Sequence, residues 1–217
     1  MNVEQARFNM IEQQIRPWDV LDSAVLQLLA VVKREDFVPP AHRALAFVDC
    51  EVPLPEGQKM LAPKVEARLL QELKVQRHES VLEVGAGSGF MAALLGHRAR
   101  RVLTLENRPV LARFAADNLK RAGLANVQVR EADGREGAQE SGPFDAIVLS
   151  GSVASVPEQL LSQLKPGGRL VAIVGAEPIM QATLYTRQPA GGVSKTVLFD
   201  TVAPRLDGFA EPTRFHF

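Results

Sequence analysis

The sequence feature that most constrains the fold is a glycine-rich turn between a short apolar run and a helical pattern. Residues 81–90 read Val-Leu-Glu-Val-Gly-Ala-Gly-Ser-Gly-Phe. Gly85 permits a tight turn, and Gly87 lets the backbone lie against a ligand because it has no Cβ atom. A helix that begins near Gly89 directs free N–H groups at the same place. The segment therefore predicts a doubly wound α/β fold with a ligand at the carboxyl end of this strand, at the switch point of the sheet.

Short apolar runs alternate with helical patterns after residue 79. The expected strands are residues 80–84, 101–106, 127–131, 144–149 and 169–174. The expected helices are residues 89–97, 109–122 and 156–164. Because strands that alternate with helices form βαβ units, we expect a Rossmann-like three-layer sandwich with a mostly parallel sheet of about seven strands. Residues 195–202 and 213–217 are expected to add antiparallel edge strands.

The first 75 residues differ in character from the rest of the chain. Apolar residues recur there at helical spacing, for example after Asp22 and after Pro63. The proline-rich stretch 37–57 predicts an irregular connection. We therefore expect an N-terminal helical annex, residues 1–75, packed on a ligand-binding domain, residues 76–217, within one compact unit.

Composition argues against several classes of protein. Lys+Arg and Asp+Glu both number 25, so the net charge is zero. We therefore do not expect binding to nucleic acid or an anionic membrane through a broad basic surface. The sequence has no apolar run long enough for a transmembrane helix and no signal-peptide pattern at its start, so we expect a cytoplasmic protein. A single cysteine excludes an internal disulfide, and the four scattered histidines predict no metal site. No pattern predicts the oligomeric state.

The glycine turn fits neither of two common nucleotide motifs. A dinucleotide fingerprint has a small residue where this chain has Phe90, and an ATP-type loop ends in Gly-Lys-Ser/Thr. Here an acid, Glu83, stands two residues before the first glycine. The second expected strand ends at Glu106, whose carboxylate can accept two hydrogen bonds from ribose hydroxyls. At the end of the third strand we expect Asp133 to accept from an adenine amino group and the Ala132 N–H to donate to a ring nitrogen.

This combination resembles the class I S-adenosylmethionine-dependent methyltransferases. Other segments resemble, more specifically, the protein-L-isoaspartate O-methyltransferase family over residues 5–185. The segments that follow the family pattern in order are Lys33-Arg34-Glu35-Asp36-Phe37-Val38-Pro39, Ala46-Phe47-Val48-Asp49, Pro53-Leu54-Pro55, Gly57-Gln58, Asp133-Gly134, Pro143-Phe144-Asp145-Ala146-Ile147 and residues 161–170.

The chain departs from the family pattern on the acceptor side. After Gly-Gln the family has Thr-Ile-Ser-x-Pro, whereas this chain has Lys59-Met60-Leu61-Ala62-Pro63. Lys59 and Leu61 therefore stand at the positions of the family's two hydroxyls, where a catalytic role is implied. Residues 149–153 and the last residues of the chain also differ from the family pattern, so the chain is identified as a divergent member.

The resemblance implies S-adenosyl-L-methionine as cofactor, and it implies the residues of two subsites. The cofactor-binding residues would be Glu83, Gly85, Ala86, Gly87, Ser88, Gly89, Glu106, Asn107, Ala132, Asp133, Gly134 and Ser150. The acceptor side would be lined by Gln58, Lys59, Met60, Leu61, Pro63 and Ser150.

The implied activity is methyl transfer to a carboxylate of L-isoaspartyl residues in damaged proteins or peptides, a protein-repair reaction. Two alternatives remain open at this point. An apolar pocket around Leu61 would favour a small-molecule O-methyltransferase. The second alternative is a non-catalytic module that only binds the cofactor. The acids Glu106 and Asp133, which match the ligand, argue against this alternative.

Overall fold

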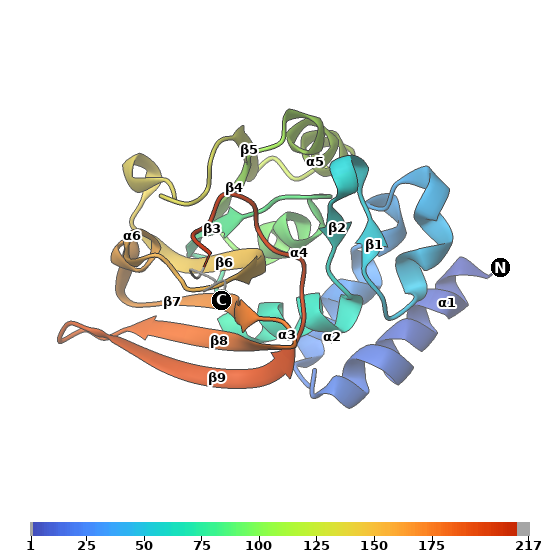
Figure 1. Ribbon diagram of the computed structural model, residues 1–217. Coiled ribbons are helices and arrows are strands. Elements are labelled where there is room, and N and C mark those ends of the chain that lie inside the picture. Colours follow the sequence, from blue (N-terminus) through green and yellow to red (C-terminus); the bar gives the residue numbers. More distant parts are fainter. Residues whose placement is uncertain (1, 212–217) are drawn as a thin grey trace, which may run out of the picture.

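A computed structural model, which describes residues 2–211, contains a seven-stranded sheet (Figure 1). The strands are β3 (Ser80–Val84), β4 (Arg101–Glu106), β5 (Val127–Glu131), β6 (Phe144–Val153), β7 (Leu164–Ala176), β8 (Ile179–Arg187) and β9 (Val193–Thr201). Their order is β5-β4-β3-β6-β7-β8-β9. The strands from β5 to β7 are parallel, and β8 and β9 are antiparallel to their neighbours, so the expected mostly parallel sheet is confirmed.

Helices fill the connections and the N-terminal part of the chain. The α-helices are α1 (Val3–Met10), α2 (Ser23–Val31), α3 (Pro63–Leu73), α4 (Phe90–Arg98), α5 (Pro109–Arg121) and α6 (Glu158–Ser162). Shorter helical turns are η1 (Ile11–Ile15), η2 (Arg16–Trp18), η3 (Arg34–Asp36), η4 (Pro40–Phe47), η5 (Pro55–Gly57) and η6 (Gln139–Ser141). A two-stranded ribbon pairs β1 (Val52–Pro53) with β2 (Lys59–Met60).

Local sequence signals explain where these helices begin. The Asp22 carboxylate accepts hydrogen bonds from the N–H groups of Ala24 and Val25 and so caps α2, a helix that the sequence predicted after Asp22. Pro63 occupies the first turn of α3, where its missing N–H costs nothing. The N-terminal helices gather at one end of the molecule (Figure 1).

The two outer layers of the sandwich are unequal. On one face of the sheet, α4 and α5 pack with α3 and the N-terminal helices in one continuous apolar core. The other face has a smaller core that the short helix α6 and Phe209 help to cover. The expected helix 156–164 is thus only α6, because β7 already begins at Leu164.

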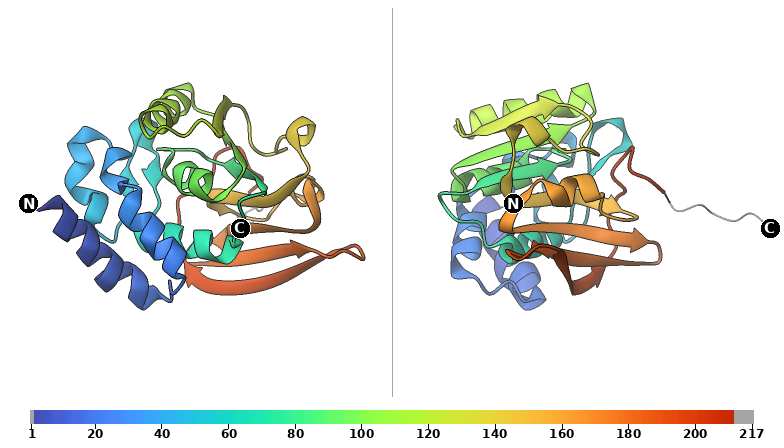
Figure 2. Two further views of the ribbon diagram at one scale, coloured as in Figure 1. Left: turned by 180° about the vertical axis from the view of Figure 1, so that it is seen from behind. Right: turned by 90° about the vertical axis from the view of Figure 1, so that its left-hand side faces the viewer.

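The antiparallel edge also differs from the expectation. The predicted strand 195–202 is β9, but its neighbour β8 was not predicted, and the turn between them projects from the body of the molecule (Figures 1 and 2). The predicted strand 213–217 lies outside the described residues. Among residues 2–211, no helix has the length and apolarity that crossing a bilayer requires.

The connections place a switch point between β3 and β6. From β3 the chain proceeds through β4 to β5 on one side, and then returns to β6 and β7 on the other. In such a sheet, ligands bind outside the carboxyl ends of the strands at this point. After β9, residues 203–209, here called the C-terminal strap, run back across these ends (Figure 1). The strap is held there by Ser152, which bonds the backbone of Pro204 at 2.7 Å and of Leu206 at 2.9 Å.

Candidate functional site

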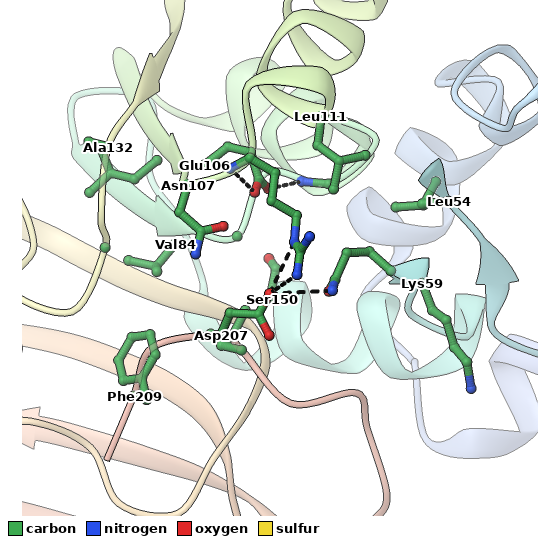
Figure 3. A pocket seen from close by; sticks show the side chains of 17 residues that line it. Leu54, Lys59, Val84, Glu106, Asn107, Leu111, Ala132, Ser150, Asp207 and Phe209 are labelled. Carbon is green, nitrogen blue, oxygen red and sulfur yellow. Dashed lines mark hydrogen bonds and ion pairs between the residues drawn. The ribbon is translucent and has the colours of Figure 1, made fainter. Parts of the chain in front are cut away.

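A cleft lies at the switch point, outside the carboxyl ends of β3 and β4 (Figure 3), where ligands bind in sheets of this kind. Its lining residues are Leu54, Gln58, Lys59, Val84, Gly85, Gly87, Leu105, Glu106, Asn107, Arg108, Leu111, Ala132, Gly134, Ser150, Leu206, Asp207 and Phe209. A smaller, deeper cavity continues from it. This inner cavity is lined by Leu54, Lys59, Met60, Leu61, Glu66, Glu83, Gly85, Ala86, Gly87, Ser88, Met91 and Ser150. The two cavities share Leu54, Lys59, Gly85, Gly87 and Ser150, so they adjoin at the glycine turn.

The glycine turn adopts a backbone that other residues would resist. Gly85 and Gly89 have φ angles of 91° and 81°, in the left-handed region. A Cβ atom on Gly85 would lie 2.7 Å from the Leu206 side chain of the C-terminal strap. On Gly89 it would lie 3.2 Å from the backbone of Ala115. Gly85 therefore allows the strap to close on the turn, and Gly89 allows α4 to begin tightly against α5.

Glu106, at the end of β4, is held as a hydrogen-bond acceptor. Its carboxylate accepts from the Gly87 N–H at 2.9 Å and from the Arg108 N–H at 3.1 Å, and its side chain is buried. Each carboxylate oxygen has a further lone pair that a hydroxyl in the cleft can use. Because the Gly87 N–H is already occupied, the turn is not arranged as a phosphate cradle. The geometry suits a ligand that presents hydroxyl donors.

Glu83, two residues before the turn, is fully buried in β3. Its carboxyl group accepts from the Thr104 hydroxyl and from the Ser150 hydroxyl, both at 2.7 Å. No Lys or Arg side chain of residues 2–211 bonds to it, and burial raises its pKa to about 8. Ser150 connects this buried acid to the cleft, which it also lines.

The segment predicted to line the acceptor side, residues 58–63 and here called the acceptor segment, is braced by a buried ion pair. Arg34, from η3, bonds the carboxylate of Glu66 in α3 and donates to the Leu61 carbonyl at 2.7 Å. Its guanidinium also lies over the Phe90 ring, 5.2 Å from the centroid, and Phe90 packs edge-on against Phe37. Phe90, which excluded a dinucleotide motif, thus joins the glycine turn to the N-terminal helices. Burial raises the pKa of Glu66 to about 7, and the neighbouring Arg34 opposes that rise.

Lys59 lies at the rim of the cleft, and its ammonium does not point inward. The side chain points away from Ser150 and Asp207 (Figure 3), and Nζ bonds the Glu51 carboxylate at 2.8 Å. The side chain of Lys59 is 53% exposed. Leu61, in contrast, is buried in the inner cavity. Of the two positions where the family pattern has a hydroxyl, only that of Leu61 faces the interior.

A charged cluster ties three segments together at the mouth of the cleft. Arg108 donates to Asp207 of the C-terminal strap at 3.0 Å through Nε and to Glu56 at 3.2 Å through Nη1. Gln58 donates to the same Asp207 carboxylate at 3.4 Å. The cluster therefore links the end of β4, the turn before β2 and the strap.

The structure brings most of the predicted site residues together, with three outside both cavities. Gly89 caps α4, and Pro63 is buried at the start of α3. Asp133 points toward Arg135, whose Nε donates to it at 2.7 Å. The Ala132 N–H donates to the Glu106 carbonyl at 2.9 Å, so it is not the free donor expected from the sequence. Ala132 does line the cleft, where contact through its other atoms stays a prediction.

Other lining residues were missed by the sequence analysis. They are Leu54, Glu66, Val84, Met91, Leu105, Arg108, Leu111, Leu206, Asp207 and Phe209. Arg108 had a usable signal, because it follows Glu106 and Asn107 at the end of a predicted strand. The strap residues had none, since their position depends on β8 and β9. In residues 2–211 no cluster of three or more His, Cys, Asp or Glu is arranged to hold a metal ion.

The fold and the cleft define a class. The sheet is doubly wound, with two antiparallel strands at one edge. A glycine turn that is not arranged to bind phosphate follows β3, and an acid, Glu106, ends β4. This is the arrangement of a class I, Rossmann-like methyltransferase.

Comparison with known proteins gives the family. The family model described as protein-L-isoaspartate(D-aspartate) O-methyltransferase matches residues 5–202. The protein-L-isoaspartate O-methyltransferase of Koribacter versatilis is 38% identical over 89% of this chain and 87% of its own length. The chain therefore belongs to the protein-L-isoaspartate O-methyltransferase family, as its sequence patterns indicated.

Solved structures agree with the fold. A protein-L-isoaspartate O-methyltransferase superposes with a TM-score of 0.78 at 22% identity, over 93% of this chain and 66% of the other. A Plasmodium falciparum protein assigned to the same activity, in complex with S-adenosyl-L-homocysteine, has a TM-score of 0.74 at 23% identity. That match covers 93% of this chain and 98% of the other.

Proposed function

We propose that this protein transfers the methyl group of S-adenosyl-L-methionine to a carboxylate, that of L-isoaspartyl residues in damaged proteins. The observation that carries the proposal is that a cleft with the expected residues occurs in a chain that belongs to this family. The cleft at the switch point holds the glycine turn and Glu106, within a chain whose family match spans residues 5–202. The relative from Koribacter versatilis and other curated relatives are named for that activity.

The residues present fit the cofactor. Glu106 lines the cleft, and its free lone pairs suit ribose hydroxyls. Gly85 and Gly87 add no side chain of their own to the turn, which Leu206 and Leu54 approach, and the Ser150 hydroxyl lies beside it. The buried acid Glu83 suits a ligand that carries positive charge. Ala86, Ser88, Asn107, Ala132 and Gly134 would complete the wall, with Gly89 and Asp133 placed just outside it.

The chemistry asks little of the acceptor side beyond alignment. When bound, S-adenosyl-L-methionine supplies an electrophilic methyl group. An acceptor carboxylate is already ionised at neutral pH, so no general base is needed. The protein must hold the attacking oxygen in line and exclude water, and such positioning supplies up to roughly 7–11 kcal/mol. Met60, Leu61 and Gln58 would do so, with Leu61 fixed through its carbonyl by Arg34.

The proposal includes the setting of the reaction. The substrate would be a protein or peptide, with no nucleic acid and no membrane involved, in the cytoplasm. Residues 1–75 would act as an annex that shapes the acceptor side of residues 76–217. The rim pair Lys59–Glu51 and the cluster around Arg108 supply charges of both signs for a peptide to meet.

The stability of the transferred methyl group tests the reaction type. The protein is incubated with S-adenosyl-L-methionine labelled in the methyl group and with a peptide that contains L-isoaspartate. The labelled product is then treated with mild base. A carboxyl methyl ester releases volatile labelled methanol, which we expect. A label that survives base would show an ether or N-methyl product and would contradict the proposal.

A second candidate function has one observation in its favour. The inner cavity is lined by the apolar side chains of Leu54, Met60, Leu61 and Met91, with no acceptor-side hydroxyl at position 61. This apolar part of a lining that also includes Glu66, Glu83 and Ser150 suits an acceptor other than a peptide carboxylate, so a small-molecule O-methyltransferase is the alternative. Base-stable labelling of a small molecule, with none on the isoaspartyl peptide, would support it.

A further inference from the structure

Three acids surround the inner end of the cleft, and their counter-charges are unequal. Glu66 is paired with Arg34. Glu106 accepts two backbone N–H groups. Glu83 accepts only two hydroxyl hydrogen bonds, although it is the most deeply buried of the three. A buried carboxylate without a cation is costly, and such a group keeps its proton instead.

The charged groups on the elements packed against Glu83 all favour its protonated form. Glu106 on β4 and Glu66 on α3 both place negative charge near Glu83, and both raise its pKa. The nearest rim cations are already engaged, because Lys59 bonds Glu51 and Arg108 bonds Asp207. The remaining neighbours, Thr104 on β4 and Ser150 on β6, are neutral hydroxyls. No side-chain cation in the described residues is left to balance Glu83.

The cleft nevertheless gives a ligand access to this acid. Ser150 Oγ donates to Glu83 and lines both cavities, and Glu83 itself lines the inner one. A positively charged ligand in the cleft would therefore stabilise the ionised form of Glu83 across a short, poorly solvated distance, where charge interactions are strong.

We propose that Glu83 is a charge-sensing residue: it is protonated before the cofactor binds and ionises when S-adenosyl-L-methionine brings positive charge into the cleft. The O–H bond of the carboxyl group breaks and the proton passes to solvent, while no covalent bond to the ligand forms. Binding is thus coupled to the release of a proton. The inference rests on the proposed cofactor, and it assigns Glu83 a positioning role rather than a chemical step.

Calorimetry of cofactor binding tests the proposal without any acceptor. Titrations of the full-length protein with S-adenosyl-L-methionine at pH 7, in buffers of different ionisation enthalpy, give the number of protons released. With a pKa of about 8, Glu83 is about nine-tenths protonated at pH 7, so close to one proton should be released. The release should fall toward zero above pH 9. Below pH 8 the affinity should rise by up to roughly tenfold per pH unit.

Matched variants separate Glu83 from other titrating groups, including the amino group of the cofactor. Glu83→Gln keeps the shape and removes the proton, so it should release close to one proton fewer than wild type. Glu131→Gln changes an exposed acid at the end of β5, which β4 separates from β3, and should match wild type. Equal proton release by Glu83→Gln and wild type would overturn the inference.

A second variant protects the test if Glu83→Gln does not fold. Ser150→Ala removes a hydrogen bond that lowers the pKa of Glu83, so the pH at which proton release ceases should move upward. Tight binding by wild type with no proton release at pH 7 overturns this inference and leaves the proposed function intact. Failure to bind the cofactor at any pH overturns both.

Discussion

Two acidic residues near the carboxyl edge of the sheet, Glu106 and Glu66, have different roles. Glu106 is fixed by the N–H groups of Gly87 and Arg108, which leaves it available as an acceptor for a ligand. Glu66 holds Arg34, which in turn holds the acceptor segment at Leu61. The sequence pointed to Glu106 because it ends a predicted strand. It did not point to Glu66, whose buried partner lies 32 residues away along the chain.

Removal of the charge at Glu106 should weaken cofactor binding. Glu106→Gln keeps the size of the side chain and loses charge-assisted hydrogen bonds worth roughly 1.5–3 kcal/mol, so the dissociation constant should rise roughly 10- to 100-fold. Calorimetry measures it. Glu131→Gln, at the register partner of Glu106 on β5, is the control and should bind as wild type does. An unchanged dissociation constant in Glu106→Gln would remove the ribose assignment.

A hydroxyl returned to position 61 should improve transfer to an isoaspartyl peptide. Leu61→Ser restores one positioning hydrogen bond worth roughly 0.5–1.5 kcal/mol, so kcat/KM should rise roughly three- to tenfold. Leu61→Ala opens a similar space without the hydroxyl and is the matched control. Both variants should lose thermal stability, because Leu61 is buried. If Ala raises kcat/KM as much as Ser does, space rather than the hydroxyl is responsible.

Secondary-structure elements were predictable where their periodicity was local. β3, β4 and β5 have the expected bounds because each is a short apolar run next to a helix. β8 was missed, although Met180, Ala182 and Leu184 alternate with more polar residues, which is the period of a half-buried strand. Without β8 the path of the chain after residue 201 could not be placed. Leu206, Asp207 and Phe209 of the C-terminal strap were therefore not expected at the cleft.

The ion pair between the C-terminal strap and β4 should slow the escape of the cofactor. Asp207→Asn weakens the contact with Arg108, and partly exposed pairs of this kind contribute roughly 0–1 kcal/mol. We expect the dissociation rate to rise roughly two- to fivefold at low salt, and less at high salt because the charges are screened. Stopped-flow competition measures that rate. Glu211→Gln, which breaks a pair with Arg205 further along, is the control. Equal dissociation rates for Asp207→Asn and this control at low salt would contradict a role of the Asp207–Arg108 pair in retaining the cofactor.

At the scale of the whole molecule, one apolar core joins the N-terminal helices to the sheet. Met10 from α1 and Leu29 from α2 belong to the same buried cluster as Val81 and Val148. Phe90 carries this continuity to the glycine turn by packing against Phe37. The alternation of strand and helix periods was enough to predict the sheet. The unequal thickness of its two covering layers was not predictable, because it depends on how far β7 extends toward α6.

Buried acids should make the cofactor-free protein less stable at alkaline pH. Burial raises the pKa of Glu83 to about 8 and that of Glu66 to about 7, above their ordinary value of 4.5. The folded state therefore holds protons that the unfolded state releases, and stability is lost as pH rises from about 5 through 8. The thermal midpoint should be at least roughly 3 °C lower at pH 9 than at pH 6. Scanning calorimetry should show a smaller drop for Glu83→Gln. A midpoint that rises over this window would contradict the account.

The most direct test of the proposed function compares two peptides that differ in one linkage. One contains L-isoaspartate and its twin contains L-aspartate at the same position, and both are offered to the protein with S-adenosyl-L-methionine labelled in the methyl group. We predict base-labile label on the isoaspartyl peptide and none above background on its twin. Equal labelling of both peptides, or cofactor binding without transfer to either, would show that the protein keeps the family's fold and cleft but uses another acceptor.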